Sequence, residues 1–205
     1  MADGFKLNTS LGKPHHDDGT DDLVGVGKTM TIILETTRLI LRHPSLNDLN
    51  NHYRLYSDPE IRRYFPDGVL TLTETREELE WYLNGHPEHP ELGLWATIHK
   101  ETGKFIGRCG LLPWEIDGKL EIEVAYLLDK HFWFQGLATE AAKGILADAF
   151  DNLNLSRIIC LMHPDNIASQ RVAQRLGMTM EGKVDGVAAD NFPTLIYAIH
   201  KSSAS

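Results

Sequence analysis

The run Trp133-Phe134-Gln135-Gly136-Leu137-Ala138-Thr139-Glu140 decides the fold of this 205-residue chain. It follows an apolar, strand-like segment over residues 120–128 and opens a helix-like segment that ends near Asn152. Gly136 and Ala138 let the backbone come close to a ligand, and the first N–H groups of a helix have no partner within it. The helix dipole adds a preference for negative charge. The run therefore predicts a phosphate-binding turn, although many such turns only connect two elements.

A second segment of the same kind lies about thirty residues further along the chain. It reads His163-Pro164-Asp165-Asn166-Ile167-Ala168-Ser169, and it follows a strand-like segment and opens another helix-like one. Asn166 is a residue type that caps helix N-termini, because its side-chain oxygen accepts a free backbone N–H. Two strand-to-helix turns with ligand-binding potential thus follow one another in the second half of the chain.

These two segments, in this order and spacing, resemble the GCN5-related N-acetyltransferase (GNAT) superfamily, in particular its branch with the ribosomal-protein alanine acetyltransferases. That branch often reads W-G-x-G-x-A-T-E, and here Phe134 stands at the position of the first glycine. The second segment matches the superfamily's P-x-N-x-x-S. The phrases Thr37-Arg38-Leu39-Ile40-Leu41-Arg42 and Arg175-Leu176-Gly177-Met178 also fit this branch. The resemblance covers roughly residues 35–201.

The resemblance implies a fold of the α/β (α+β) class with a mixed, mostly antiparallel central sheet of about seven strands flanked by helices. Hydrophobic periodicity and turn residues agree with it. We expect strands at 38–42, 94–100, 104–112, 120–128, 156–162, 178–184 and 194–200, and helices at 45–56, 58–64, 73–83, 136–152 and 166–177. The order excludes a dinucleotide-binding unit, which needs three spaced glycines and an early βαβ arrangement.

Composition limits the classes of protein that this chain can represent. A formal net charge of −9 makes general nucleic-acid binding unfavourable, because phosphate contacts need clustered Lys and Arg. No apolar run approaches the ~18–20 residues of a membrane span. Both cysteines, Cys109 and Cys160, lie in strand-like runs and are expected to be reduced core thiols. We expect a cytoplasmic protein with one domain over residues 30–205, preceded by a disordered extension or expression remnant over 1–29.

Acetyl transfer from a thioester to an amine needs a base for the amine, a donor for the oxyanion and a place for the thiolate. Glu123 matches the glutamate to which this branch assigns the role of base, directly or through water. Glu121 shares its face of the strand, since side chains repeat every two residues, and paired carboxylates can raise one pKa. The alternative is a solvated face with two surface acids. The resemblance also places an oxyanion donor among the backbone N–H groups of residues 125–127.

The resemblance implies further roles in the second turn. Ser169 approaches the thioester sulfur, where a hydrogen bond to the leaving thiolate is its safest role, and Asn166 contacts the cofactor or the oxyanion. Tyr126, Tyr197 and His163 are alternative proton carriers, although such residues are more often structural. The full set implied to bind acetyl-coenzyme A comprises Leu127, Trp133, Phe134, Gln135, Gly136, Leu137, Ala138, Thr139, Asn166 and Ser169. No metal site is expected.

Two functions therefore remain open at the level of sequence. The first is an N-acetyltransferase that uses acetyl-coenzyme A to acetylate a peptide or protein N-terminus, or a small-molecule amine. The second is a module of the same fold that binds an acyl-coenzyme A without turnover, as a sensor or regulator. The acceptor pocket is expected to form from residues 56–72 and 183–192. Neither a nucleic acid nor a membrane is expected as a partner, and the chain is expected to be a monomer or a homodimer.

Overall fold

A computed structural model describes residues 31–202 of the chain, apart from residues 84, 87 and 188–190. Its strands form one sheet in the order β1-β2-β3-β4-β5-β6-β8-β7. Neighbouring strands are antiparallel except for β5 and β6, which run parallel. The strands are β1 (Ile32–Glu35), β2 (Leu39–Arg42), β3 (Gly93–His99), β4 (Lys104–Ile116), β5 (Lys119–Leu128), β6 (Arg157–Met162), β7 (Thr179–Asp185) and β8 (Pro193–His200).

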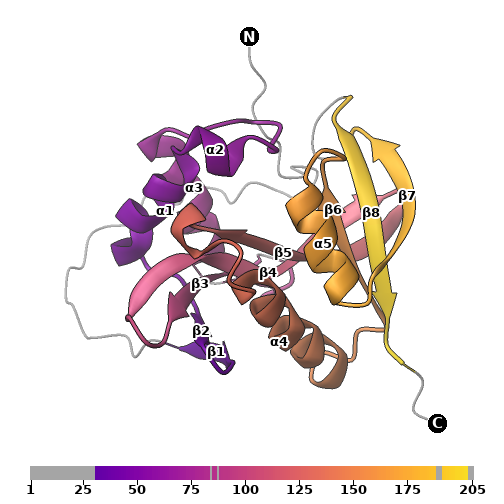
Figure 1. The fold of residues 1–205 in the computed structure, drawn as a ribbon, viewed down its shortest axis with the longest axis horizontal. Helices are drawn as coiled ribbons and strands as arrows, with labels where there is room; N and C mark the ends of the chain where they lie inside the picture. The colour runs from indigo at the N-terminus through magenta and orange to yellow at the C-terminus, as the bar shows by residue number, and fades with distance from the viewer. Residues whose placement is uncertain (1–30, 84, 87, 188–190, 203–205) are drawn as a thin grey trace.

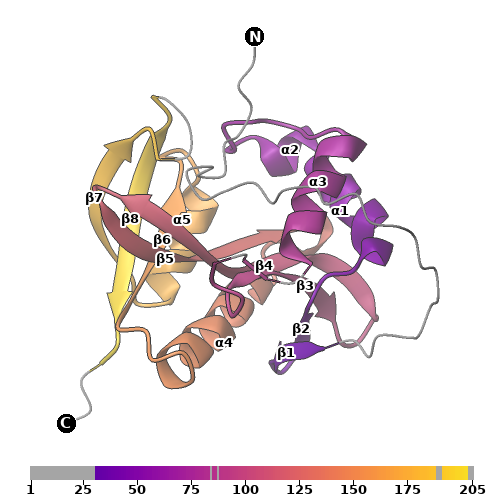
Figure 2. The same ribbon diagram turned by 180° about the vertical axis from the view of Figure 1, so that it is seen from behind.

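Helices cover both faces of this sheet. The α-helices are α1 (Leu49–Tyr56), α2 (Pro59–Arg62), α3 (Leu72–Tyr82), α4 (Leu137–Asp151) and α5 (Ile167–Arg175). Helix α4 lies in front of the sheet in Figure 1, and α3 lies in front of it in the reverse view of Figure 2. No helix in the described ranges is long and apolar enough to cross a membrane.

The main hydrophobic core lies between the sheet and α4 with α5. Residues Leu137, Ala141 and Ile145 of α4 are almost fully buried there against Leu111 and Val124 of the two longest strands. Smaller clusters on the opposite face join α1 and α2 to Leu127, and α3 to Leu112 and Ala125. Alternate residues of β5 therefore face the two helical layers.

The structure confirms the predicted fold class and adds one strand to the seven expected. The additional strand, β1, has four residues and pairs only with β2, so it carries little periodic signal. Strand β4 also continues to Ile116, beyond the expected end at Leu112. Its pairing with β3 stops at Leu111, so Pro113 lies where its missing N–H removes no bond to β3. The predicted extension over residues 1–29 lies outside the described residues.

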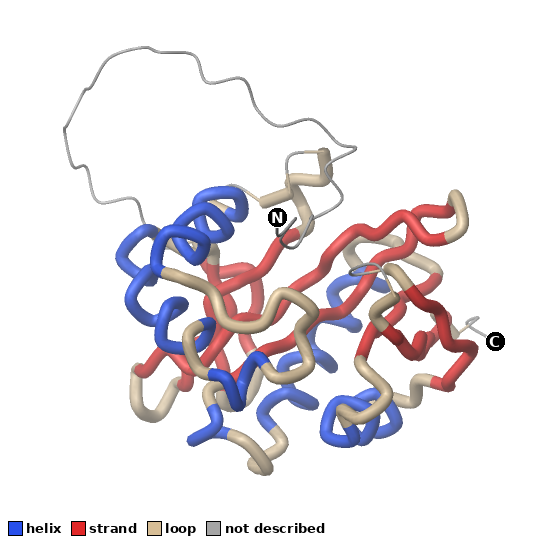
Figure 3. Tube along the Cα trace, turned by 90° about the horizontal axis from the view of Figure 1, so that it is seen from above, coloured by secondary structure: helices blue, strands red, loops and turns tan. Residues whose placement is uncertain are grey.

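The parallel strands β5 and β6 part soon after they meet. Their register contains one residue pair, Glu123 with Ile159, whereas β5 stays paired with β4 as far as Leu128. Beyond Glu123 the sheet opens between β5 and β6, and the turns that start α4 and α5 follow these two strands. Seen from above, α1–α3 gather at one end of the molecule and the β7–β8 hairpin at the other (Figure 3). The opening therefore lies between two halves of the protein.

Candidate active site

The turn that starts α4 has the backbone of a glycine-rich turn, although only one of its residues is glycine. Gly136 caps the helix with φ of 76°, and Phe134 adopts φ of 60°. Both values are left-handed, which is easy for glycine and costs about 1–2 kcal/mol for other residues. The Phe134 side chain is 95% exposed. Phe134 thus adopts a backbone conformation that glycine accepts without steric cost, and its side chain is exposed to solvent.

Hydrogen-bond donors gather at this turn. The first backbone bond of α4 runs from the Glu140 N–H to the Gly136 carbonyl. Helix geometry therefore leaves the N–H groups of Leu137, Ala138 and Thr139 without an acceptor inside the helix. The buried Thr139 hydroxyl also has no hydrogen-bond partner among the described residues. These donors, together with the positive end of the helix dipole, suit an anion.

Trp133 and Gln135 hold the turn in place. The indole N–H of Trp133 donates to the carbonyl of Leu128, the last residue of β5, at 2.8 Å. The Gln135 side-chain amide donates to the His131 carbonyl at 3.0 Å. Both side chains are thus directed at the protein, and they place the turn relative to the end of β5. Any contact that these residues make with a ligand is expected to come from their backbone.

The start of α5 holds a small hydrogen-bonded cluster. The Asn166 side chain caps the helix by accepting the Ser169 N–H at 3.1 Å. The Ser169 hydroxyl lies 2.9 Å from the Tyr126 hydroxyl, which donates to the Ser169 carbonyl at 3.2 Å. The Cys160 thiol donates to the same tyrosine oxygen at 3.6 Å. Burial raises the pKa of the Cys160 thiol to about 12, so this thiol stays protonated at neutral pH.

Glu123 lies in the middle of β5, with 7% of its surface exposed. Burial raises the pKa of its carboxyl to about 7, partly opposed by hydrogen bonds and by the positive charge of Arg108. One carboxylate oxygen accepts the Trp114 indole N–H at 2.7 Å, and the other accepts the Leu161 N–H at 3.2 Å. A carboxyl that titrates near neutral pH inside a protein is a candidate acid or base.

Glu121 has a different environment from Glu123. It binds the Arg157 guanidinium, with 3.0 Å between Oε2 and Nε, and that guanidinium also binds Glu181 through two hydrogen bonds. Arg157 thereby ties β5 and β6 to β7. The raised pKa of Glu123 comes from burial, and Glu121 is not among its causes. The mechanism expected from paired carboxylates is therefore not the one that acts on Glu123.

The residues considered as alternative proton carriers have structural partners. The Tyr197 hydroxyl donates to the Gln170 side chain at 3.4 Å. The His163 ring stacks on Tyr64, with 5.7 Å between ring centroids, and contacts Phe192 at 5.2 Å. Tyr64 and Phe192 belong to the two segments, 56–72 and 183–192, that were expected to form an acceptor pocket. These segments therefore meet beside the end of β6.

Comparison with known proteins agrees with this geometry. The sequence family described as acetyltransferase (GNAT) domain matches residues 38–179. The chain belongs to the GNAT acetyltransferase family. The match spans both turns, the strand that carries Glu123 and the opening between β5 and β6. The protein is accordingly an acetyltransferase, and the predicted resemblance is confirmed.

Individual relatives support the same assignment. The chain is 30% identical over 150 residues to the uncharacterized N-acetyltransferase p20 of Bacillus licheniformis, covering 73% of this chain and 83% of the relative. It is 29% identical over 149 residues to the uncharacterized N-acetyltransferase YnaD of Bacillus subtilis, covering 73% and 84%. RimL, a ribosomal L7/L12 alpha-N-protein acetyltransferase solved with coenzyme A, matches with a TM-score of 0.68, covering 82% of this chain and 97% of RimL. Its 20% identity shows a shared fold alone.

The GNAT fold brings the predicted site residues to one region. Glu123 lies where β5 and β6 part, Leu127 lies near the end of β5, and the turns with Gly136 and Ser169 follow the two strands. Trp114 was expected only as a possible lining residue of the acceptor pocket, and two contacts of this region were not predicted. Trp114 is a partner of Glu123, and Arg38 donates to the Gln135 carbonyl at 3.0 Å. The sequence shows the motif phrase that contains Arg38, but no local pattern predicts its contact with a turn 97 residues away.

Proposed function

We propose that this protein transfers the acetyl group of acetyl-coenzyme A directly to a primary amine. The acceptor is the N-terminus of a peptide or protein, or the amine of a small molecule. The observation that carries the proposal is the buried carboxyl of Glu123, whose pKa burial raises to about 7, at the point where β5 and β6 part. Ser169 and the Gly136 turn lie beyond the ends of the same two strands.

In this proposal Glu123 acts as the base. A free alkylamine has a pKa near 10 and is mostly protonated at neutral pH, so it must lose a proton before it attacks. With a pKa of about 7, the Glu123 carboxyl is partly ionised at neutral pH and is matched to general base catalysis near that pH. A carboxylate that already accepts two hydrogen bonds keeps lone pairs for the amine, or for one water between them.

The residues of the two turns would hold the acetyl donor, whose thioester supplies the activated acetyl group. Residues 133–139 would bind its pyrophosphate through the backbone N–H groups at the start of α4. Leu127, Asn166 and Ser169 would lie along the arm that carries the thioester. Such positioning of two reactants can by itself lower the barrier by several kcal/mol.

The chemical step can be written with all atoms in balance. The amine nitrogen forms a bond to the acetyl carbon, the carbon–sulfur bond breaks, and the proton lost by the amine passes to Glu123. A backbone N–H within residues 125–127 would donate to the carbonyl oxygen as it gains charge. The Ser169 hydroxyl would donate a hydrogen bond to the departing thiolate, which then takes up the second proton that the attacking nitrogen loses as the amide forms, and Glu123 returns the first proton to solvent. The products are an N-acetylated amine and the free thiol of coenzyme A.

The test has two stages. Calorimetric titration with acetyl-coenzyme A should give micromolar binding, and an amine panel is then screened for release of free thiol. Peptide N-termini come first in the panel because of the likeness to RimL. Glu123→Gln should bind acetyl-coenzyme A with unchanged affinity and lose roughly 10²-fold or more in turnover. Glu115→Gln, at an exposed site on the neighbouring strand, is the control.

Each stage has an outcome that contradicts the proposal. No binding at millimolar acetyl-coenzyme A would contradict the assignment of a cofactor site to the two turns. Tight binding without thiol release on any amine would instead favour an acyl-coenzyme A sensor. Unchanged turnover in Glu123→Gln would leave acetyl transfer in place and remove Glu123 as the base.

A further inference from the structure

The side chain of Trp114 on β4 reaches Glu123 on the neighbouring strand β5. The register of β4 and β5 places Trp114 opposite Glu121 and Leu112 opposite Glu123. Trp114 and Glu123 are therefore diagonal neighbours on one face of the sheet, where Cβ atoms are about 7–8 Å apart. Only a long side chain spans that distance, and the indole does so with its N–H 2.7 Å from Glu123 Oε2.

Packing fixes the indole in this orientation. The half-buried Trp114 side chain packs against two hydrophobic clusters, one that contains Leu112 and Ala125 together with Tyr82 of α3, and one that contains Ile116 together with Ile159 of β6. It thus bridges two hydrophobic clusters at the point where β5 and β6 part. A side chain that is held on both sides keeps its hydrogen bond in one direction.

The backbone of β6 holds the second carboxylate oxygen. The Leu161 N–H donates to Glu123 Oε1 at 3.2 Å, two residues after the last paired position of β6 with β5. Glu123 therefore takes the place of a missing β5 partner for this N–H group. With one donor on each oxygen, the carboxylate plane is defined by two elements outside its own strand.

We propose that Trp114 is a positioning residue for the acetyl-transfer reaction: its indole N–H orients the Glu123 carboxylate and favours its ionised form at the opening between β5 and β6. This inference rests on the proposed function, in which Glu123 is the base. A buried carboxylate without donors stays protonated and cannot accept the proton of an amine.

Three titratable groups near Glu123 are neutral at pH 7, so the two hydrogen bonds and one cation are what favour its ionised form. Tyr82 of α3, Tyr126 of β5 and Cys160 of β6 interact with Glu123, and burial raises the pKa of each of them. They are thus neutral near pH 7. Arg108 of β4 is the positive charge that favours the Glu123 carboxylate.

The guanidinium of Arg108 also interacts with Tyr56 and Glu78. Its Nε donates to the Tyr56 hydroxyl at 2.5 Å, and this hydroxyl donates to Glu78 at 2.6 Å. Glu78 also lies 3.9 Å from Arg108 Nε. The negative charge of Glu78 offsets part of the effect of Arg108 on Glu123. The direct hydrogen bond from Trp114 is therefore the stronger candidate for control of the base.

The test compares Trp114 with Trp81, which packs against the same hydrophobic cluster around Leu112 and Ala125. Trp114→Phe keeps most of the ring and removes the N–H, so the acid limb of kcat/KM against pH should move up by about one unit. The rate should fall about fivefold at pH 7 and recover near pH 9, with unchanged affinity for acetyl-coenzyme A. Trp81→Phe is the matched control, because Trp81 packs in the same cluster and makes edge contacts with Tyr82 and His86. Its acid limb should not move.

A spectroscopic measurement tests the pair without any substrate. Indole fluorescence responds to ionisation of a carboxyl that it contacts, so the wild-type protein should show a transition near pH 7. Glu123→Gln and Trp114→Phe should both lose this transition, and Trp81→Phe should keep it. If Trp114→Phe fails to fold, the comparison of wild type with Glu123→Gln still decides whether an indole reports on Glu123, and Trp114 is the indole that donates to it.

The outcomes separate this inference from the proposed function. An active wild-type enzyme whose acid limb is unchanged in Trp114→Phe would overturn the positioning role and leave acetyl transfer intact. A fluorescence transition that persists in Glu123→Gln would also overturn it. If the wild-type protein has no acetyltransferase activity but still shows the fluorescence transition near pH 7, the contact between Trp114 and Glu123 stands and its role in catalysis is overturned.

Discussion

Arg38, directly before β2, forms an ion pair with Glu140 in the first turn of α4, with 2.6 Å between Nε and Oε2. The same carboxylate accepts the Arg38 backbone N–H and the Thr36 hydroxyl, each at 2.7 Å. Burial alone would raise the pKa of Glu140, but these hydrogen bonds from Thr36 and Arg38 lower it. Arg38 also donates to the Gln135 carbonyl. The pair therefore anchors the Gly136 turn to the segment between β1 and β2, at one edge of the sheet.

Replacing Glu140 by Gln should loosen this anchor. The amide keeps some hydrogen bonds and loses the charge, so we expect a loss of roughly 1–2 kcal/mol in the free energy of unfolding. The affinity for acetyl-coenzyme A should fall too, because the turn loses its support. Urea unfolding and calorimetric titration measure the two effects. The control is Glu35→Gln, whose partner is Lys100 at 2.8 Å on a more exposed surface, and it should change both quantities little. Equal effects of the two substitutions would contradict the anchoring role.

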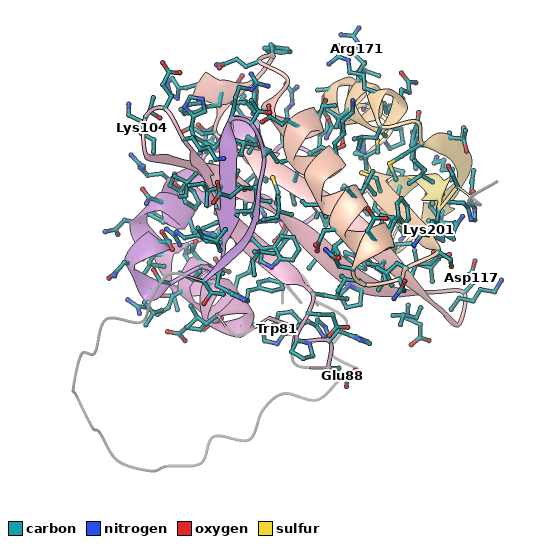
Figure 4. All side chains as sticks on the ribbon, turned by 90° about the horizontal axis from the view of Figure 1, so that it is seen from below. Trp81, Glu88, Lys104, Asp117, Arg171 and Lys201 are labelled. Atoms are coloured by element: carbon teal, nitrogen blue, oxygen red, sulfur yellow. The ribbon has the colours of Figure 1, made fainter. Side chains whose placement is uncertain are left out.

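Gly136→Ala should weaken binding and stability together. With φ of 76°, an added Cβ has Arg38 Nη2 as its nearest neighbour at 3.7 Å, so the cost is backbone strain rather than a clash. We expect about 1 kcal/mol of destabilisation and a clear loss of acetyl-coenzyme A affinity. Gly118→Ala is a matched control: φ is 71°, and nothing lies within 4 Å of its added Cβ. Its neighbour Asp117 marks the outer tip of the β4–β5 hairpin, far from α4's first turn (Figure 4). If Gly118→Ala reduces affinity as much, the turn is not a binding site.

Phe134→Gly should raise stability without reducing cofactor affinity. Phenylalanine at φ of 60° carries a steric cost of about 1–2 kcal/mol, and glycine at the same position carries none, although its greater freedom in the unfolded chain offsets part of the gain. The ring is 95% exposed, so little packing is lost. Thermal unfolding and calorimetric titration test both parts. A strong loss of affinity would mean that the exposed ring itself contacts the ligand.

Local features of this protein could be predicted from the sequence, and contacts between distant segments could not. The Gly136 turn and the Asn166 cap depend on the residues beside them, and both are where the motifs indicated. The bond between Trp114 and Glu123 depends on the register of β4 and β5, which no motif specifies. The expected cause of the raised Glu123 pKa, a pairing with Glu121, was wrong for the same reason. The actual cause is burial, which depends on the packing of whole elements.

Buried Glu123 should make stability depend on pH. Its carboxyl has a pKa of about 7 in the folded protein, against 4.5 as the reference value for the unfolded chain. Because folding raises this pKa, folding favours the protonated form. The stabilising contribution is complete below pH 4.5 and is lost as the pH rises through about 7. A difference of this size corresponds to roughly 3 kcal/mol.

Urea unfolding of the wild type and of Glu123→Gln at pH 5 and pH 8 isolates the contribution, since other titrating groups are common to both proteins. The wild type should lose about 2.5 kcal/mol relative to the variant between the two pH values, because at pH 5 the unfolded carboxyl is already mostly ionised, and parallel pH dependences would show that Glu123 does not titrate in this range.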